Sequence, residues 1–376
     1  MAVQEGSSCT RAVMQMRPKQ MQPEALEVAV GGEGLCTVCW VKEAEPAEAK
    51  GKPQQRVPME LWLCFIFLLP FSLVHGADRA SFSRHFRSSQ QEEKEEAAKW
   101  ESILRIRRLN SLSNGDNTTA FYGMNQFSHL FPEEFRAIYL QSKSSKVPKF
   151  TPEVRVEEID KPLPAKFDWR DKGIVTKVRN QGVCGGCWAF SVVGIIESVH
   201  AIKRNVLEEL SVQQVIDCSY INSGCRGGSP VGALGWINQT RVKLVRDSEY
   251  HFQAETGLCR YFSRADFGVS IKGYAAYDLS DQEDKMKKLL LEWGPLAVVV
   301  DAASWQDYLG GIIQYHCSSG EPNHAVLITG YDTTGSIPFW IVKNSWGPAW
   351  GIDGYVRIKI GSNVCGIADE VSAAFL

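Results

Sequence analysis

The sequence lacks a surplus of charge of either sign: 41 Lys and Arg residues oppose 43 Asp and Glu residues, and the formal net charge is -2. A main partner that is nucleic acid or an anionic membrane usually demands a strong basic surplus, so we expect neither partner. The composition, 44% hydrophobic and 22% charged, is ordinary for globular proteins and excludes disorder of the whole chain. A length of 376 residues allows two or three folded units.

Cysteine is absent between Cys64 and Cys184, although the chain contains 11 cysteines. The gap indicates a boundary between parts of different character. So many cysteines are typical of an exported protein in an oxidising compartment. Because the number is odd, at least one thiol stays unpaired or pairs with another molecule.

A run of apolar residues long enough to cross a bilayer is also missing near the N-terminus, where residues 61–74 make a run of only 14. This length fits the core of a secretory signal peptide, which we place at residues 59–76 with cleavage after Gly76. Met59 is then the working start. Residues 1–58 have no sustained apolar period, and we interpret them as an N-terminal extension, disordered or upstream of the true start. The alternative is an uncleaved membrane anchor.

Two further parts follow. Residues 77–162 are highly charged; within them the pattern of residues 91–110 predicts an amphipathic helix, and the prolines of residues 142–164 predict an extended linker. Residues 163–376 read as a compact domain of 214 residues.

This domain changes character along its length. The dense apolar stretch of residues 188–201 predicts a buried central helix. Short β-branched or aromatic segments predict strands at residues 296–300, 325–329, 339–342 and 355–360. A helical half and a β half predict an α+β fold of two packed lobes, with the ligand site in the cleft between them.

Cys187 stands at the start of the predicted central helix, where the helix dipole and free N–H groups stabilise a thiolate. Cys184 lies three positions earlier, a spacing also found in redox dithiols and zinc sites. His324 follows Cys187 by 137 residues, and Asn344 follows His324 by 20. A base and a group that orients it are what a nucleophilic cysteine needs, so this set favours nucleophilic catalysis over the other two readings.

The segments Gln181-Gly-Val-Cys-Gly-Gly-Cys-Trp188 and Lys343-Asn-Ser-Trp-Gly347 carry a specific resemblance. Residues 163–376 resemble papain-like cysteine peptidases throughout. The resemblance implies that a helical left lobe packs on a β-barrel-like right lobe, that a helical propeptide precedes them, and that peptide bonds are hydrolysed through a thioester without a cofactor or metal.

The resemblance also assigns roles. Cys187 would be the nucleophile, His324 its imidazolium partner and Asn344 the group that orients the imidazole. Trp346 would shield the His–Asn hydrogen bond, and the oxyanion would be bound by the Gln181 amide and the backbone N–H of Cys187. Gly186 departs from the Ser or Ala usual between the two cysteines, but it removes no catalytic group.

Spacing alone leaves fifteen pairings open for the six other cysteines of the domain. The family pattern implies Cys184–Cys225, Cys218–Cys259 and Cys317–Cys365. Cys187 then remains as the free thiol.

Residues 77–162 resemble the inhibitory propeptide of the family, which would make the propeptide a partner of the domain. The motif at residues 123–127 carries the match, and Leu163 is a plausible mature N-terminus. His129 stands where the family usually has an Asp. A carboxylate there could act as an acid sensor, whereas a histidine would titrate nearer pH 6.5.

Two absences favour an endopeptidase within this family: no His-rich insertion lies between Cys225 and Cys259, and residues 77–162 contain no cysteine. The family pattern places four residues at the substrate pocket: Gly227, Gly228, Asn323 and Glu370. We hypothesise that Glu370, at the pocket floor, lets it accept Arg as well as apolar residues. The alternative is an exposed surface carboxylate.

The remaining predictions concern context. Asn117 and Asn238 are candidate glycosylation sites. We interpret three histidines as ordinary packed or surface groups: His200, His251 and His316. The resemblance implies a monomer that reaches the lysosome through the secretory pathway or is released outside the cell, acts on proteins and peptides, and meets cystatin-type inhibitors. Two other functions stay open: a catalytically silent homologue that binds peptides or inhibitors, and a thiol–disulfide oxidoreductase.

Overall fold

The computed structural model describes residues 25–31, 35–41, 78–112, 119–151, 162–260, 267–317 and 320–376. The chain divides into two compact units, Met1–Arg84 and His85–Leu376. Among the described residues, none of the helices combines the length and the apolar character needed to cross a membrane. The predicted signal peptide at residues 59–76 lies outside the described residues.

The first unit contains an antiparallel pair of strands, β1 (Ala25–Gly31) and β2 (Leu35–Val41). This differs from the expectation that residues 1–58 lack regular structure. Both strands are rich in valine, which favours strand pairing locally even where the average composition of a segment is polar.

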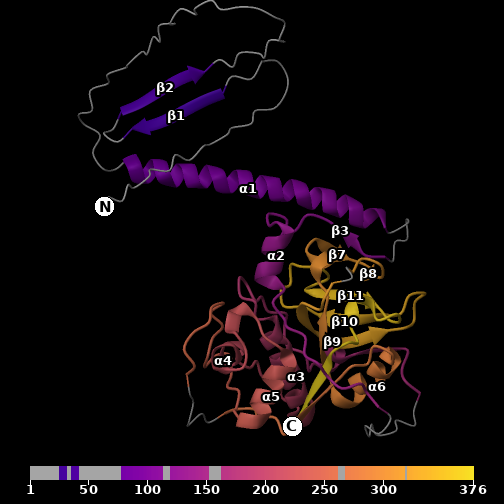
Figure 1. The fold of residues 1–376 in the computed structure, drawn as a ribbon. Helices are drawn as coiled ribbons and strands as arrows, with labels where there is room; N and C mark the ends of the chain where they lie inside the picture. The colour runs from indigo at the N-terminus through magenta and orange to yellow at the C-terminus, as the bar shows by residue number, and fades with distance from the viewer. Residues whose placement is uncertain are drawn as a thin grey trace, which may run out of the picture. The chain divides into compact units, whose positions relative to one another are not determined.

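Residues 78–151, named here the propeptide segment, supply two helices and a short strand. The helices are α1 (Asp78–Ser111) and α2 (Pro132–Tyr139), and the strand is β3 (Phe121–Tyr122). The helix predicted at residues 91–110 is confirmed as the C-terminal part of the longer α1. Figure 1 shows α1 in purple and α2 in magenta.

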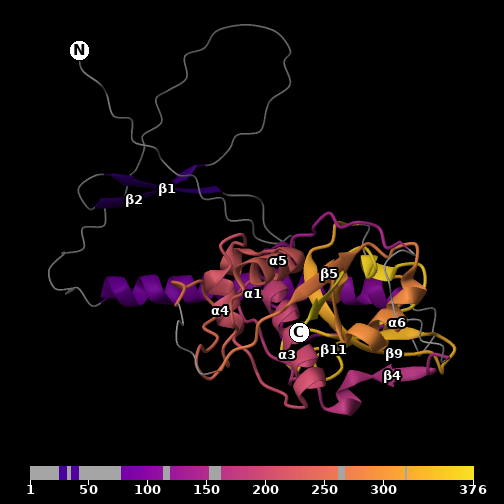
Figure 2. The ribbon, with the colours of Figure 1, turned by 90° about the horizontal axis from the view of Figure 1, so that it is seen from below.

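The helical lobe of the domain is built around α3 (Cys187–Arg204), which is buried along almost its whole length. Asn205 ends α3 in the left-handed conformation, and its backbone N–H bonds the Ala201 carbonyl. Two further helices, α4 (Val212–Cys218) and α5 (Pro230–Thr240), begin at serine caps whose hydroxyls accept backbone N–H groups. These helices lie together on one side of the domain (Figures 1 and 2).

The other lobe is a sheet with the strand order β5-β12-β6-β9-β10-β11-β8, in which β4 also pairs with β9. Its pairs are antiparallel except for β11 with β8. The strands are β4 (Lys166–Asp168), β5 (Gly273–Tyr277), β6 (Leu296–Val300), β8 (Ile312–Ile313), β9 (His324–Asp332), β10 (Phe339–Lys343), β11 (Tyr355–Lys359) and β12 (Val371–Phe375). The helix α6 (Glu283–Trp293) and the short strand β7 (Tyr308–Gly310) complete the lobe.

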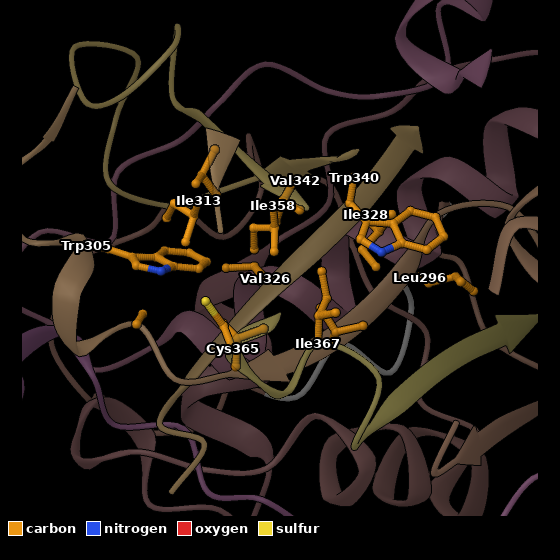
Figure 3. Close-up of a cluster of buried hydrophobic side chains, with 14 of the residues drawn as sticks. Leu296, Trp305, Ile313, Val326, Ile328, Trp340, Val342, Ile358, Cys365 and Ile367 are labelled. Carbon is orange, nitrogen blue, oxygen red and sulfur yellow. The ribbon is translucent and has the colours of Figure 1, made fainter. Parts of the chain in front are cut away.

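Each lobe has its own hydrophobic core. One core surrounds α3, and the other lies on the sheet, where Val326, Ile328 and Trp340 pack together (Figure 3). The sheet core also takes in side chains of the propeptide segment. The predicted α+β fold is confirmed, and the four predicted strands are β6, β9, β10 and β11.

Three disulfides are present: Cys184–Cys225, Cys218–Cys259 and Cys317–Cys365. They are the pairs that the resemblance implies. Among the cysteines whose side chains the structure describes, Cys187 is the free one, and it is buried. Since Cys184 is bonded to Cys225, it cannot form a dithiol with Cys187 in this state, which argues against the oxidoreductase reading.

Candidate active site

Cys187 is the first residue of α3, and Gly186 caps the helix without a side chain. The segment before it is held by the Cys184–Cys225 disulfide and by a hydrogen bond from the Gly185 N–H to the Cys225 carbonyl. A Cβ at Gly185 would meet that carbonyl oxygen at 2.6 Å, so the close approach requires glycine. The tight turn places the thiol at the N-terminus of the central helix.

His324 begins β9 and is fully buried. Its Nε2 lies 2.7 Å from Oδ1 of Asn344, the residue that follows β10. The same oxygen accepts the backbone N–H of Ser345, which identifies it as the acceptor and gives Nε2 the hydrogen. The neutral imidazole then has its lone pair on Nδ1, which makes no hydrogen bond with the described residues.

Trp346 stacks on this pair. Its ring centroid lies 4.6 Å from that of His324 with an interplanar angle of 29°, and both rings are shielded from solvent. The indole therefore keeps water away from the hydrogen bond between His324 and Asn344, which strengthens that bond.

Burial also decides the charges in this state. It raises the pKa of the Cys187 thiol to about 11, although the backbone of Ala325 and the N–H groups at the start of α3 lower it. Burial lowers the pKa of His324 to about 4 against the raising effects of the Asn344 side chain and the Tyr139 backbone. Both groups are thus neutral near pH 7. The ionised thiolate expected from the helix N-terminus does not form here, because desolvation outweighs the helix N–H groups.

Gln181 is fully buried and lies close to the same turn. Its Oε1 accepts the Ser345 hydroxyl at 2.6 Å, and its Nε2 donates to the Cys184 carbonyl at 2.8 Å. Since Ser345 fixes which end of the amide is oxygen, the second N–H of Nε2 is available to another acceptor. Ser345 was missed by the sequence analysis; its place next to Asn344 was the available signal.

The propeptide segment crosses this site in extended form. The Ser142 N–H bonds the Asn323 carbonyl, and the Lys143 N–H bonds the Gly228 carbonyl. The Gly228 N–H bonds the Gln141 carbonyl in turn, and Ser142 and Gly228 form a parallel bridge. A Cβ at Gly227 would meet the same Gln141 oxygen at 2.2 Å. Three of the predicted pocket residues, Gly227, Gly228 and Asn323, therefore surround an extended stretch of the propeptide segment.

Glu370, the fourth predicted pocket residue, is only 1% exposed, so it is not a surface carboxylate. One oxygen, Oε2, accepts the Ser144 hydroxyl and the Ser145 backbone N–H. The other, Oε1, has no hydrogen-bond partner among the described residues. Burial raises the pKa of this carboxyl group.

Aromatic side chains of the propeptide segment cover the same region. Phe127, Phe135 and Tyr139 contact Trp346 with their rings roughly perpendicular to the indole. A cavity of about 390 Å³ remains between α2 and the domain, lined by Arg136, Leu140, Asp301 and Asn323 among others. The propeptide segment thus covers the imidazole through Trp346.

Other predicted residues lie away from this region. His129 is exposed. Asn238 lies on α5, where its Oδ1 accepts a hydrogen bond from Arg241. Asn117 lies outside the described residues. Among those described, groups of three or more side chains able to hold a metal ion are absent.

Comparison with known proteins gives the same picture. Residues 163–375 match the model of the papain family of cysteine proteases. The chain is 66% identical to cathepsin O of Homo sapiens and 59% identical to cathepsin O of Mus musculus, over 76% of this chain and 88% and 91% of those proteins. The structure is similar to that of procathepsin L2 from the larval midgut of Tenebrio molitor, with a TM-score of 0.70 and 29% identity over 79% of this chain and 99% of that one.

The matching domain, the relatives and the covering segment agree in one assignment. This chain belongs to the papain family of cysteine proteases and is the zymogen of a cysteine endopeptidase.

Proposed function

We propose that Cys187, His324 and Asn344 perform the hydrolysis, once the propeptide segment has left and water has returned to the site. The supporting observation is the free thiol of Cys187 at the start of α3, together with an imidazole whose Nε2 is held by Asn344 and whose Nδ1 makes no hydrogen bond with the described residues. The domain boundaries proposed with it are a signal peptide at 59–76, a propeptide at 77–162 and a mature enzyme from residue 163.

In the proposed reaction the Cys187 thiol gives its proton to Nδ1 of His324, and the sulfur attacks the carbonyl carbon of a peptide bond and forms a C–S bond. The free N–H of the Gln181 amide and the backbone N–H of Cys187 bind the oxyanion. The imidazolium of His324 gives its proton to the leaving nitrogen as the C–N bond breaks. Water, deprotonated by the same imidazole, then hydrolyses the thioester and restores the thiol.

The test is cleavage of a peptide library by the activated protein. We expect cleavage by the wild type and its loss in Cys187→Ser. An epoxysuccinyl reagent should label Cys187. If a folded, activated protein shows neither labelling nor turnover, the silent homologue that binds peptides is the correct reading.

We propose that Glu370 gives the substrate pocket its preference. A buried carboxylate with one unpartnered oxygen favours a ligand that supplies two N–H groups, as a guanidinium does. In Glu370→Gln the activated enzyme should lose its acceptance of Arg relative to Leu at this pocket by about tenfold, while cleavage of Leu substrates persists. An unchanged ratio of kcat/KM for Arg and Leu peptides contradicts the assignment.

We further propose that the enzyme acts in the lysosome after passage through the secretory pathway, is inhibited by cystatin-type proteins and works as a monomer. The three disulfides suit an oxidising route of export, and one chain supplies every residue of the site. Microscopy of the chain that starts at Met59, together with a lysosomal marker, tests the location. Titration of the activated enzyme with a cystatin tests the inhibition, and light scattering tests the monomeric state.

A further inference from the structure

His316 is a histidine of the peptidase domain that the propeptide segment buries. His316 follows β8, and the residue is only 4% exposed. Nε2 lies 3.2 Å from the Leu109 carbonyl oxygen on α1, and the ring centroid lies 5.1 Å from that of Tyr122 on β3. Both partners belong to the propeptide segment, so its departure removes these contacts.

The hydrogen bonding of His316 fixes its charge in the zymogen. A carbonyl oxygen only accepts, so Nε2 carries the hydrogen in the bond to Leu109. Nδ1 is buried and has no hydrogen-bond partner among the described residues. A second proton would therefore create a buried charged N–H without an acceptor, which is costly. Burial accordingly lowers the pKa of His316, against the raising effect of the Leu109 carbonyl.

The groups around His316 do not offset this cost. Tyr122 on β3, whose ring contacts His316, and Tyr308 on β7, whose ring contacts Tyr122, are buried. Their pKa values are raised, so both phenols are neutral. On α1, Arg105 is paired with Asp307 of the domain one turn before Leu109.

The neighbours of His316 in the sequence add no counter-charge. Tyr315 lies beneath the ammonium group of Lys359, and Cys317 is in a disulfide. Burial is the cause of the lowered pKa of His316; the Leu109 carbonyl acts in the opposite direction, and no charged side chain is among the causes.

We propose that His316 is an acid sensor of the zymogen: its protonation below neutral pH opposes the docking of α1 and β3 and promotes release of the propeptide segment. The direction follows from linkage. A histidine freed by release titrates near its ordinary pKa of about 6.5, and the docked form resists the proton. The contribution of His316 to docking is complete above that pH and weakens as the pH falls.

This inference revises the interpretation of His316 as an ordinary group. It also moves the acid-sensing role away from His129, which is exposed in the zymogen. It rests on the zymogen assignment, and it does not require the chemistry proposed for Cys187.

The test uses the full chain with Cys187→Ser, so that self-cleavage cannot contribute. Release of the propeptide segment from the domain, here called opening, is measured between pH 7 and pH 5 as the rate at which an added peptidase cleaves that segment. The rate is corrected for the activity of the added peptidase on an unfolded protein at each pH. In His316→Gln the side chain can still donate to Leu109 but cannot titrate. We expect the increase in opening to be roughly tenfold smaller than in the parent. His129→Gln is the control and should behave as the parent.

A His316→Gln profile that follows the parent profile overturns the proposal. A second measurement does not depend on that variant folding well: histidine NMR titration of the Cys187→Ser zymogen and of the same protein after removal of the propeptide. The pKa of His316 should be lower in the zymogen. Equal values in the two states would also overturn it.

Discussion

Asn344 accepts hydrogen bonds from the His324 ring and from the Ser345 backbone, and these two bonds set the plane of the imidazole. Asn344→Ala removes the acceptor but leaves Trp346 stacked on the ring. We expect kcat of the activated enzyme to fall by roughly tenfold to a hundredfold because the imidazole loses its orientation.

Steady-state kinetics on a peptide substrate give the measurement. Thr334→Ala, which removes an exposed hydroxyl bonded to Asp332, is the matched control and should leave kcat unchanged. An Asn344→Ala enzyme with wild-type kcat would show that Trp346 and the strand β9 alone hold the ring.

Motifs in the sequence predicted these side chains, because each motif states its own local geometry. Cys187 follows a glycine turn, and Asn344, Ser345 and Trp346 are consecutive. The charge states of Cys187 and His324 were not predictable in this way. It depends on burial by residues such as Tyr139 and Gln141, which no motif links to the thiol or the imidazole.

At the level of elements, α1 docks on the domain through an ion pair. Arg105 Nε donates to Asp307 Oδ2 at 2.7 Å, and the Ser128 hydroxyl donates to the other oxygen. The Asp307 side chain is fully buried, and desolvation raises its pKa despite the arginine. Arg105→Ala would leave this carboxylate uncompensated, and we expect the zymogen to lose about 3–5 kcal/mol of stability.

Chemical denaturation of the Cys187→Ser zymogen measures this loss. Arg108→Ala is the control, because Arg108 lies on the same last part of α1 and is exposed. Equal losses in the two variants would mean that the helix, and not the Arg105–Asp307 pair, carries the effect.

Helices and strands with a clear period were predicted close to their observed bounds; β6 matches at both ends. The start of α1 at Asp78 was missed, because residues 78–90 carry many charged and serine side chains without a clear apolar period. The pairing of β3 with β7 was not predictable either, since it joins two short segments almost 190 residues apart in the sequence.

In the molecule as a whole, burial by the propeptide segment keeps Cys187 and His324 neutral, and this lowers the reactivity of the Cys187 thiol. With the pKa of Cys187 raised to about 11 from 9.0, the thiolate fraction at pH 7 is about a hundredfold below that of an ordinary thiol. We expect alkylation of Cys187 to be at least about a hundredfold slower in the zymogen than in the activated enzyme.

Mass spectrometry of iodoacetamide labelling against pH tests this. In the zymogen the rate should still rise with pH above 9, whereas in the activated enzyme it should level off at lower pH. Because exclusion of the reagent alone would slow labelling equally at every pH, the shape of the profile separates the two causes. Identical profile shapes would contradict the electrostatic account.

The division into a covering segment and a two-lobed domain was predicted from composition and motifs, since the cysteine-free stretch and the domain differ in character. The pairing of β1 with β2 was not predicted, because two short strands that contain valine are hidden in the average composition of a polar segment.

Trp346 stacks on His324, and it also contacts the rings of Phe127, Phe135 and Tyr139 from the propeptide segment. Trp305 and Trp350 of the domain contact the same indole. When the three rings of the propeptide segment depart, the part of the indole that they covered becomes exposed to water, beside the proposed catalytic base His324. A ligand that places an aromatic ring against this exposed part of Trp346 regains the lost aromatic contact. Inhibitors built with an aromatic group at this position should therefore outbind their aliphatic counterparts on the activated enzyme.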